Sequence, residues 1–254
     1  MRTDALEIDR FYKSRRGQAA RAMVQRRLGA IWGDAHGLDV MALGFGAPYL
    51  DLWAEKARRV ISFNPASQGA TPWPNREASL TALGDETRLP FKEAMFDRVV
   101  LIHALEEAGE PARILREVWR ILAPEGRVAI VCAHRAGLWS RADSTPFGHG
   151  RPFSRTQLAR LLNNALFEPT AWSRALYTPP FKLSCGPRGT EGFEAVGERL
   201  FPAFGGLLLA EAVKHVGAVR PGGTPERRRV TVLDGQGVRG LSPQSTPNKH
   251  RQDS

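Results

Sequence analysis

Two glycines separated by one residue, Gly44 and Gly46, end the apolar run Val40–Leu43. Because glycine has no Cβ, the chain can bend tightly at such a pair and a ligand can approach the backbone amides closely. A plain strand-to-helix turn can contain the same two glycines. Here, however, further predicted strands and an acidic turn, Gly84-Asp85-Glu86, come after the pair. That order favours a nucleotide-type site, held by backbone amides and a carboxylate.

A histidine, His103, directly follows the strongly apolar run Phe96–Ile102. Since the ordinary pKa of histidine lies near neutrality, a histidine at a strand end can accept a proton from a reacting oxygen or nitrogen. A structural histidine with its hydrogen bonds satisfied is an equally good interpretation. We interpret Glu106 and Glu107, which come next, as the exposed start of a helix.

A framework of alternating strands and helices has to bring these residues together. Apolar patterning predicts seven strands, over Val40–Leu43, Arg59–Phe63, Ala78–Leu83, Phe96–Ile102, Arg127–Cys132, Phe167–Leu176 and Gly206–Lys214. It also predicts helices, over 5–13, 15–32, Ala47–Lys56, Glu110–Leu122 and Arg155–Asn164, with another around Gly192–Leu200. Such alternation predicts an α/β fold in which helices cover both faces of a mostly parallel, seven-stranded sheet.

Composition divides the chain into three parts. Residues 1–34 are predicted to form an N-terminal helical cover, 35–219 the α/β domain and 220–254 a flexible basic tail in which 230–233 could pair locally. The irregular segment 139–153, rich in Gly, Pro and aromatic residues, follows the fifth predicted strand. We expect either a substrate-gating loop or an ordinary connection there.

The chain has 254 residues, a formal net charge of +10 and two cysteines, Cys132 and Cys185. Two cysteines are too few for a disulfide framework or a zinc site, so we expect no metal and a reducing, cytoplasmic location. We also expect no membrane span, because the longest apolar stretch, Gly205–Val213, has the length of a strand. The positive charge fits an RNA or other polyanion partner, but we favour a basic tail and a solvated helix face as its explanation.

Two classes of nucleotide ligand use a glycine turn after the first strand: dinucleotides and S-adenosylmethionine. The dinucleotide fingerprint needs a third glycine at the sixth position, for close packing of helix on strand. Counted from Gly44, that position is Tyr49. Its bulky side chain argues against NAD or FAD.

Four segments resemble the class I S-adenosylmethionine-dependent methyltransferases, in particular the type 11 group. They are LGFG (43–46), GDETRLPF (84–91), FDRVVLIHALEE (96–107) and LREVWRILAPEGRVAIV (115–131). The resemblance covers about residues 37–135, and its last segment is the most specific. More loosely, the FYKSRRG opening, the PFGHGRPFS loop and the GGLLLAEAVK end look like a bacterial subfamily of uncertain substrate. The resemblance implies a Rossmann-like fold and methyl transfer from S-adenosylmethionine to an unidentified acceptor.

The resemblance also implies roles for the glycine turn and the acidic turn. Gly44 and Gly46 would let the backbone pass against the methionine end of the cofactor. Asp85 would accept a hydrogen bond from the adenine amino group, with Glu86 and Thr87 beside it.

Three further residues have implied places around the cofactor. Ile102 and His103 would flank the cofactor and the transferred methyl group, and His103 is the tentative catalytic residue. Tyr12 resembles an N-terminal aromatic residue that lies near the cofactor in related enzymes.

The chain departs from the family pattern at two positions. The family has an acidic residue two positions before the first glycine, where this chain has Ala42. It also has Asp or Glu after the second strand, to hold the ribose hydroxyls, where this chain has Asn64. Asn64 can still accept a hydrogen bond, but a weaker one than a carboxylate accepts.

Three hypotheses about function therefore stay open. The first is a methyltransferase, for which we favour a small-molecule acceptor. The second is a catalytically weak or inactive methyltransferase-like binding protein, motivated by Ala42 and Asn64. The third is an RNA methyltransferase, motivated by the net charge. The sequence has no signal for the acceptor or for the oligomeric state.

Overall fold

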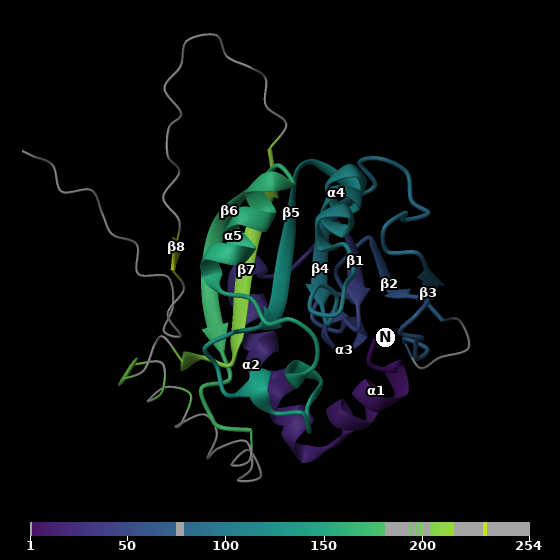
Figure 1. Ribbon diagram of the computed structural model, residues 1–254. Helices are drawn as coiled ribbons and strands as arrows, with labels where there is room; N and C mark the ends of the chain where they lie inside the picture. Colours follow the sequence, from purple (N-terminus) through teal and green to yellow (C-terminus); the bar gives the residue numbers. More distant parts are fainter. Residues whose placement is uncertain are drawn as a thin grey trace, which may run out of the picture.

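The computed structural model describes residues 2–74, 79–180 and 204–215, together with residues 194, 197, 199, 200, 231 and 232. Eight strands form one sheet in the order β3-β2-β1-β4-β5-β7-β6-β8 (Figure 1). Their bounds are Asp39–Gly44 (β1), Arg59–Pro65 (β2), Thr81–Gly84 (β3), Phe96–Ile102 (β4), Leu122–Ala133 (β5), Phe167–Ala175 (β6), Leu207–Lys214 (β7) and Thr231–Val232 (β8).

The first five strands are mutually parallel, and β7 runs antiparallel to both β5 and β6. The predicted mostly parallel sheet of seven strands is thus confirmed. The two-residue strand β8 adds an eighth member at the edge by pairing with β6. The order reverses at β1, because β2 and β4 lie on either side of it. In open sheets of this kind, ligands bind at such a reversal, outside the carboxyl ends of the strands.

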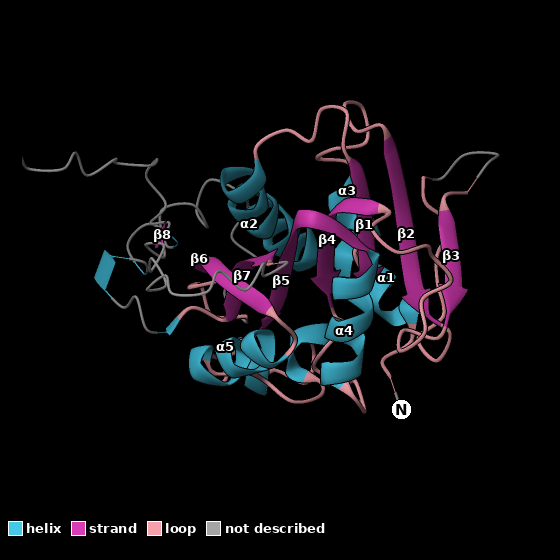
Figure 2. Ribbon diagram, turned by 90° about the horizontal axis from the view of Figure 1, so that it is seen from above, coloured by secondary structure: helices cyan, strands magenta, loops and turns pink. Residues whose placement is uncertain are grey.

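Five α-helices surround the sheet in the described part of the chain. They are Ala5–Lys13 (α1), Arg15–Trp32 (α2), Ala47–Leu50 (α3), Pro111–Ile121 (α4) and Arg155–Asn164 (α5). Seen from above, α2 and α3 cover one face and α4 and α5 the other (Figure 2). Helix α1 lies below the carboxyl ends of the central strands, close to the N-terminus (Figure 1). The predicted covering of both faces, and the two N-terminal helices, are confirmed.

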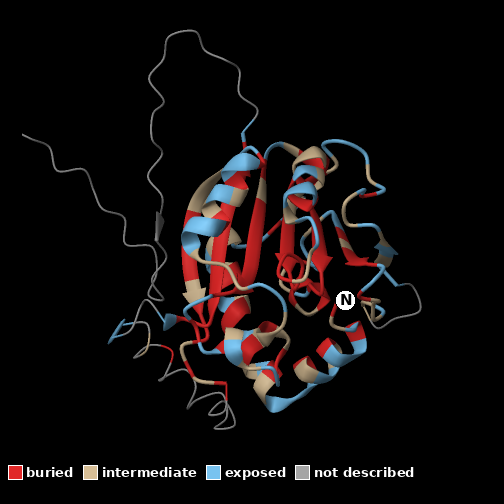
Figure 3. Cartoon of the chain, viewed as in Figure 1, coloured by how far each residue is buried: buried red, intermediate tan, exposed pale blue. Residues whose placement is uncertain are grey.

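Side chains of each central strand alternate between two apolar clusters. In β1, Val40 and Ala42 pack with α1 and α2, whereas Met41 and Leu43 pack with α4 and α5. Burial on both faces explains why the parallel strands are continuous apolar runs rather than alternating ones. The centre of the sheet is accordingly buried, and the outer helix surfaces are exposed (Figure 3).

Some element boundaries differ from those predicted. Helix α3 ends at Leu50, not at residue 56, because successive turns replace it. In these turns Leu52 donates to the Tyr49 carbonyl and Lys56 to the Trp53 carbonyl. Strand β5 begins at Leu122, five residues before the predicted start at Arg127, and ends at Ala133.

Other predictions concern the loop and the end of the chain. The irregular segment 139–153 contains two short 3₁₀ helices, Trp139–Arg141 (η1) and Pro146–Gly148 (η2). Cys185 and almost all of the predicted helix around 192–200 and of the basic tail lie outside the described residues. Among the residues that the structure describes, no helix is long and apolar enough to cross a membrane, and no cluster of His, Cys, Asp and Glu could hold a metal ion.

Candidate active site

The glycine turn lies at the carboxyl end of β1, against the end of β4. Gly44 has a positive φ of 85°, and a Cβ on it would lie 2.3 Å from the Ile102 carbonyl oxygen and 3.0 Å from the Ala104 Cβ. A Cβ on Gly46 would lie 2.6 Å from the Ala42 Cβ. Both glycines are therefore required by the packing of this chain on itself. This close packing also brings the turn directly against the residues that follow β4.

His103 is buried where β4 ends, with a φ of 51° that L-residues rarely adopt. Its Nε2 lies 2.9 Å from the Tyr12 hydroxyl. Burial, and secondarily the nearby His149, lower the pKa of His103 to about 3. The expectation of a near-neutral pKa was therefore wrong, since a buried imidazolium would lose its hydration. At pH 7 the ring is a neutral hydrogen-bonding group.

Tyr12, from α1, joins the N-terminal cover to this histidine. Its hydroxyl lies 2.9 Å from both the Tyr49 hydroxyl and His103 Nε2. Burial and the contact with Tyr49 raise the pKa of Tyr12 well above its ordinary value, so the phenol stays protonated. Tyr12 also stacks on Phe45, the residue between the two glycines. The structure thus brings Tyr12, the glycine turn and His103 together, whereas their contact with a cofactor stays a prediction.

The loop after β5 closes over the same histidine. The ring of Phe147, in η2, lies 4.6 Å from the His103 ring, centroid to centroid, and contacts both Phe11 and Trp139. Trp139 is fully buried and donates to the Thr178 carbonyl. Trp139 and Phe147 thus anchor the segment 139–153 in the core, and Phe147 packs over the end of β4.

The end of β2 contributes two buried amides. Asn64 accepts a hydrogen bond from the Ser62 hydroxyl at its Oδ1. Gln68 donates from Nε2 to the His103 carbonyl at 3.3 Å. The backbone carbonyl of Gln68 accepts a hydrogen bond from the backbone N–H of Ala5. This bond connects the loop after β2 to the start of α1.

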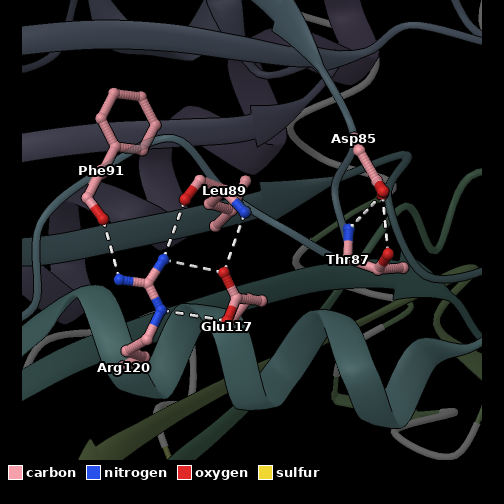
Figure 4. Close-up of polar contacts among 6 residues, drawn as sticks. All are labelled: Asp85, Thr87, Leu89, Phe91, Glu117 and Arg120. Atoms are coloured by element: carbon pink, nitrogen blue, oxygen red, sulfur yellow. Dashed lines mark hydrogen bonds and ion pairs between the residues drawn. The ribbon is translucent and has the colours of Figure 1, made fainter.

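The acidic turn after β3 has the opposite character, because it is exposed. The Oδ1 of Asp85 accepts hydrogen bonds from the N–H and the hydroxyl of Thr87, at 2.8 and 2.7 Å (Figure 4). These bonds lower the pKa of Asp85. Asp85 and Thr87 therefore form a preformed turn, while the neighbouring Glu86 points to Arg2, at 2.8 Å.

Helix α4 holds the segment after this turn in place. Its ion pair Glu117–Arg120 also hydrogen-bonds to backbone groups of that segment. Arg120 donates to the carbonyls of Leu89 and Phe91, and Glu117 accepts from the Leu89 N–H and from Arg120 (Figure 4). These are residues of the GDETRLPF and LREVWRIL segments, so two of the four family-like segments contact each other. Through this contact α4 positions the segment that follows the acidic turn.

The first residues of the chain lie across the site. The Arg2 side chain is 4% exposed and donates from Nη2 to Glu86 and to the Ala104 carbonyl. Thr3 donates from its N–H and its hydroxyl to Glu107. The predicted helical cover thus reaches into the carboxyl ends of the strands, and does more than shield a sheet face.

Glu106 is buried, not at an exposed helix start as we predicted, because α4 begins only at Pro111. Its Oε1 accepts from the Ala133 N–H at the end of β5. Burial raises the pKa of Glu106 to about 7, against its ordinary 4.5. Glu106 and Glu107 also line a cavity of about 320 Å³ together with Gly150 and Arg151.

Three buried polar atoms around the end of β4 have no hydrogen-bond partner in the described structure: Arg2 Nη1, Gln68 Oε1 and Glu106 Oε2. Sequence reasoning missed all three residues as site residues. Their partners are up to 102 positions away in the chain, so no local pattern could have identified them.

Comparison with known proteins agrees with this arrangement. Residues 38–130 match the family model of a methyltransferase domain. Over 136 residues the chain is 31% identical to a protein of Mycolicibacterium smegmatis named as a probable S-adenosylmethionine-dependent methyltransferase, covering 52% of each chain. Over 64 residues it is 38% identical to the demethylmenaquinone methyltransferase of Streptomyces griseus, covering 25% of each. The chain thus spans about half the length of the first relative and a quarter of the second.

Solved structures share the fold at low identity. A methyltransferase of Thermotoga maritima, described as a possible histamine N-methyltransferase, superposes with a TM-score of 0.55 at 17% identity, covering 82% of this chain and 95% of that one. An S-adenosylmethionine-dependent methyltransferase of Aquifex aeolicus gives 0.53 at 14% identity, covering 84% and 100%. Together with the matched segment, they confirm the resemblance and the Rossmann-like fold class. Residues 38–130 of this chain thus match a methyltransferase domain and are similar to S-adenosylmethionine-dependent methyltransferases.

Proposed function

We propose that this protein transfers a methyl group from S-adenosylmethionine to a small-molecule acceptor. The observation that carries the proposal is the close packing of the Gly44 turn on the residues after β4, at the reversal point of a family-typical sheet. The cofactor supplies an electrophilic methyl group on a positively charged sulfonium. Gly44, Gly46, Asn64, Asp85, Glu86, Thr87, Ile102, His103 and Tyr12 stay predictions as its contacts.

The residues around the end of β4 fit such a cation. His103 is neutral at pH 7, and the rings of Tyr12, Phe45 and Phe147 lie close to it or to one another. Aromatic faces attract cations, whereas a protonated histidine would repel one. The unpartnered atoms of Arg2 and Gln68 provide buried polar groups for the remainder of the ligand.

Methyl transfer is an in-line displacement, so alignment of the acceptor and exclusion of water supply much of the rate. In this chain, exclusion of water is the task of Tyr12 and Phe147, which seal His103 from solvent. The low pKa of His103 makes it a weak proton acceptor, so we assign it a positioning role. The cavity of about 320 Å³ beside Glu106 lies in the size range of small-ligand pockets, which favours a small acceptor.

Isothermal titration with S-adenosylmethionine and S-adenosylhomocysteine tests the cofactor. We expect both to bind, and absence of heat with both would contradict the proposal. Incubation with methyl-labelled cofactor and fractionated cell extract then tests the acceptor. We expect label in small molecules, and label only in protein or RNA would contradict the small-molecule assignment.

A second candidate, a methyltransferase-like protein that binds without catalysis, is favoured by Ala42 and Asn64. Ala42 is fully buried against Gly46, so no carboxylate can take this position without repacking. Asn64→Asp tests the candidate. In a binding protein it raises cofactor affinity without producing turnover, whereas measurable methyl transfer by the wild type rejects the candidate.

A third candidate is an RNA methyltransferase, which rests on the net charge of +10. It predicts RNA binding that weakens with salt and depends on the residues from Arg220 onward. Truncation at Arg220 with unchanged RNA affinity would speak against it. A cytoplasmic location likewise stays a prediction.

A further inference from the structure

The guanidinium of Arg2 lies inside the site, and only some of its N–H groups are hydrogen-bonded. Its side chain is 4% exposed, and Nη2 donates to Glu86 Oε1 at 2.8 Å and to the Ala104 carbonyl at 3.0 Å. Its Nη1, although buried, has no hydrogen-bond partner among the residues that the structure describes. A buried cationic donor without a partner is costly, so the position favours an additional acceptor. Since both nitrogens of the guanidinium fork match the two oxygens of a carboxylate, a carboxylate is the best such acceptor.

Gln68 offers the complementary group. It is 1% exposed, and its Nε2 donates to the His103 carbonyl. Its Oε1 is buried and has no hydrogen-bond partner in the described part of the chain, so Gln68 offers an acceptor where Arg2 offers a donor. An ammonium group would satisfy Oε1.

The two side chains bind the carbonyls of two consecutive residues, so both reach the segment that follows β4. Gln68 binds the carbonyl of His103, and Arg2 binds that of Ala104. A Cβ on Gly44 would lie 3.0 Å from the Ala104 side chain, so this segment also adjoins the glycine turn. The backbone of Ala5 bonds to Gln68, which links the Arg2 segment to the loop that contains Gln68.

We propose that Arg2 and Gln68 bind the α-carboxylate and the α-ammonium of the methionine part of S-adenosylmethionine. The inference rests on the proposed function, because it concerns the same cofactor. The N-terminal segment then supplies a direct ligand contact in addition to covering the site. Because Arg2 Nη1 and Gln68 Oε1 are inaccessible to solvent, the ligand reaches them when the segment Arg2–Ala5 lifts away, and Arg2 then shifts from Glu86 to the carboxylate.

The test compares two ligands by isothermal titration. S-adenosylhomocysteine has the amino-acid part, and 5′-methylthioadenosine shares its adenosine and thioether but lacks that part. In Arg2→Met, we expect affinity for S-adenosylhomocysteine to fall about 10- to 100-fold, the range for a lost hydrogen bond to a charged group. Affinity for 5′-methylthioadenosine should change less than about threefold on the same reasoning. Gln68→Met should show the same selectivity with a smaller loss.

Two further variants control for the fold and for charge. Arg10→Met removes an exposed arginine of α1 and should change neither affinity. Arg2→Lys keeps the charge without the fork, so it should recover part of the lost affinity. Equal losses for both ligands in Arg2→Met, or no loss at all, would overturn the inference while leaving the proposed function intact. A wild-type protein that binds neither ligand would overturn the proposed function and the inference with it.

Discussion

The carboxyl ends of β4 and β3 lie at the same edge of the sheet but differ in almost every physical property. At the end of β4, His103 is buried, has a positive φ and is enclosed by Tyr12 and Phe147. At the end of β3, Asp85 is exposed and bonded only within its own turn. The difference indicates that the methionine end of a ligand would be enclosed at β4, whereas the adenine end would meet a preformed turn near solvent.

Adding a single methyl group at the glycine turn should give the largest change in the free energy of unfolding. Gly44→Ala forces a strained φ and places a Cβ 2.3 Å from the Ile102 carbonyl oxygen. We expect the free energy of unfolding to fall by about 4 kcal/mol, from strain and overpacking together. Chemical denaturation measures the change.

Gly37→Ala is the matched control for this prediction. Gly37 also has a positive φ, of 71°, but no atom lies within 4 Å of a Cβ added there. We expect a loss of about 1 kcal/mol, from backbone strain alone. Equal losses in the two variants would show that the end of β4 is not packed against the turn as described.

At the buried end of β4, the titration of Glu106 should make the free energy of unfolding depend on pH. Its folded-state pKa is about 7 and its ordinary value 4.5, so the native state holds the proton more tightly than the unfolded chain. The associated stability is fully present below pH 4.5 and is lost as pH rises through 7. From pH 5 to pH 8, we expect Glu106→Gln to gain about 2.5 kcal/mol in unfolding free energy relative to the wild type.

Glu117→Gln provides the control, because Arg120 lowers the pKa of Glu117. That carboxylate stays largely ionised between pH 5 and pH 8 in both states, so the difference from the wild type should be nearly constant. Denaturation curves at both pH values provide the measurement. A Glu106→Gln variant with the same pH course as the wild type would disprove the buried titration.

Loss of one hydroxyl should have a somewhat smaller effect. Tyr12→Phe leaves both the Tyr49 hydroxyl and His103 Nε2 without their shared partner. We expect a loss of about 2 kcal/mol. Tyr49→Phe keeps the contact between Tyr12 and His103 and should cost about 1 kcal/mol. Thermal melting of both variants measures these losses of stability. A larger loss of stability in Tyr49→Phe than in Tyr12→Phe would contradict the bridging role of Tyr12.

Substitutions in the exposed turn after β3 should change the stability of the protein least. Asp85→Ala should leave the melting temperature unchanged, because the exposed Asp85 side chain hydrogen-bonds within the described residues only to Thr87. We expect binding of S-adenosylhomocysteine to weaken about tenfold through the lost adenine contact. Thr87→Val, which keeps the carboxylate, should weaken it less. Unchanged affinity in Asp85→Ala, measured by titration, would remove the adenine assignment.

The sequence predicts those parts of the molecule that local patterns determine. Apolar periodicity identified β4, α2 and α5, because each buries a continuous face of its own residues. The glycine turn was identified because its packing needs residues without a Cβ.

The remaining site residues depend on distant partners. Arg2 reaches Ala104, 102 positions away, and Glu106 reaches Ala133 on the next strand. The pKa of His103 depends on burial under Tyr12 and Phe147, which meet it only in the folded chain. Patterns within one segment contain no record of such contacts.

The hydrogen bonds from Arg120 to the carbonyls of Leu89 and Phe91 have a consequence for mutational screens. Because these bonds join α4 to the segment that follows the acidic turn, we expect a change at Arg120 to alter the position of that turn. Selection for altered ligand affinity should therefore recover substitutions at position 120, although that side chain belongs to a helix on the sheet's outer layer.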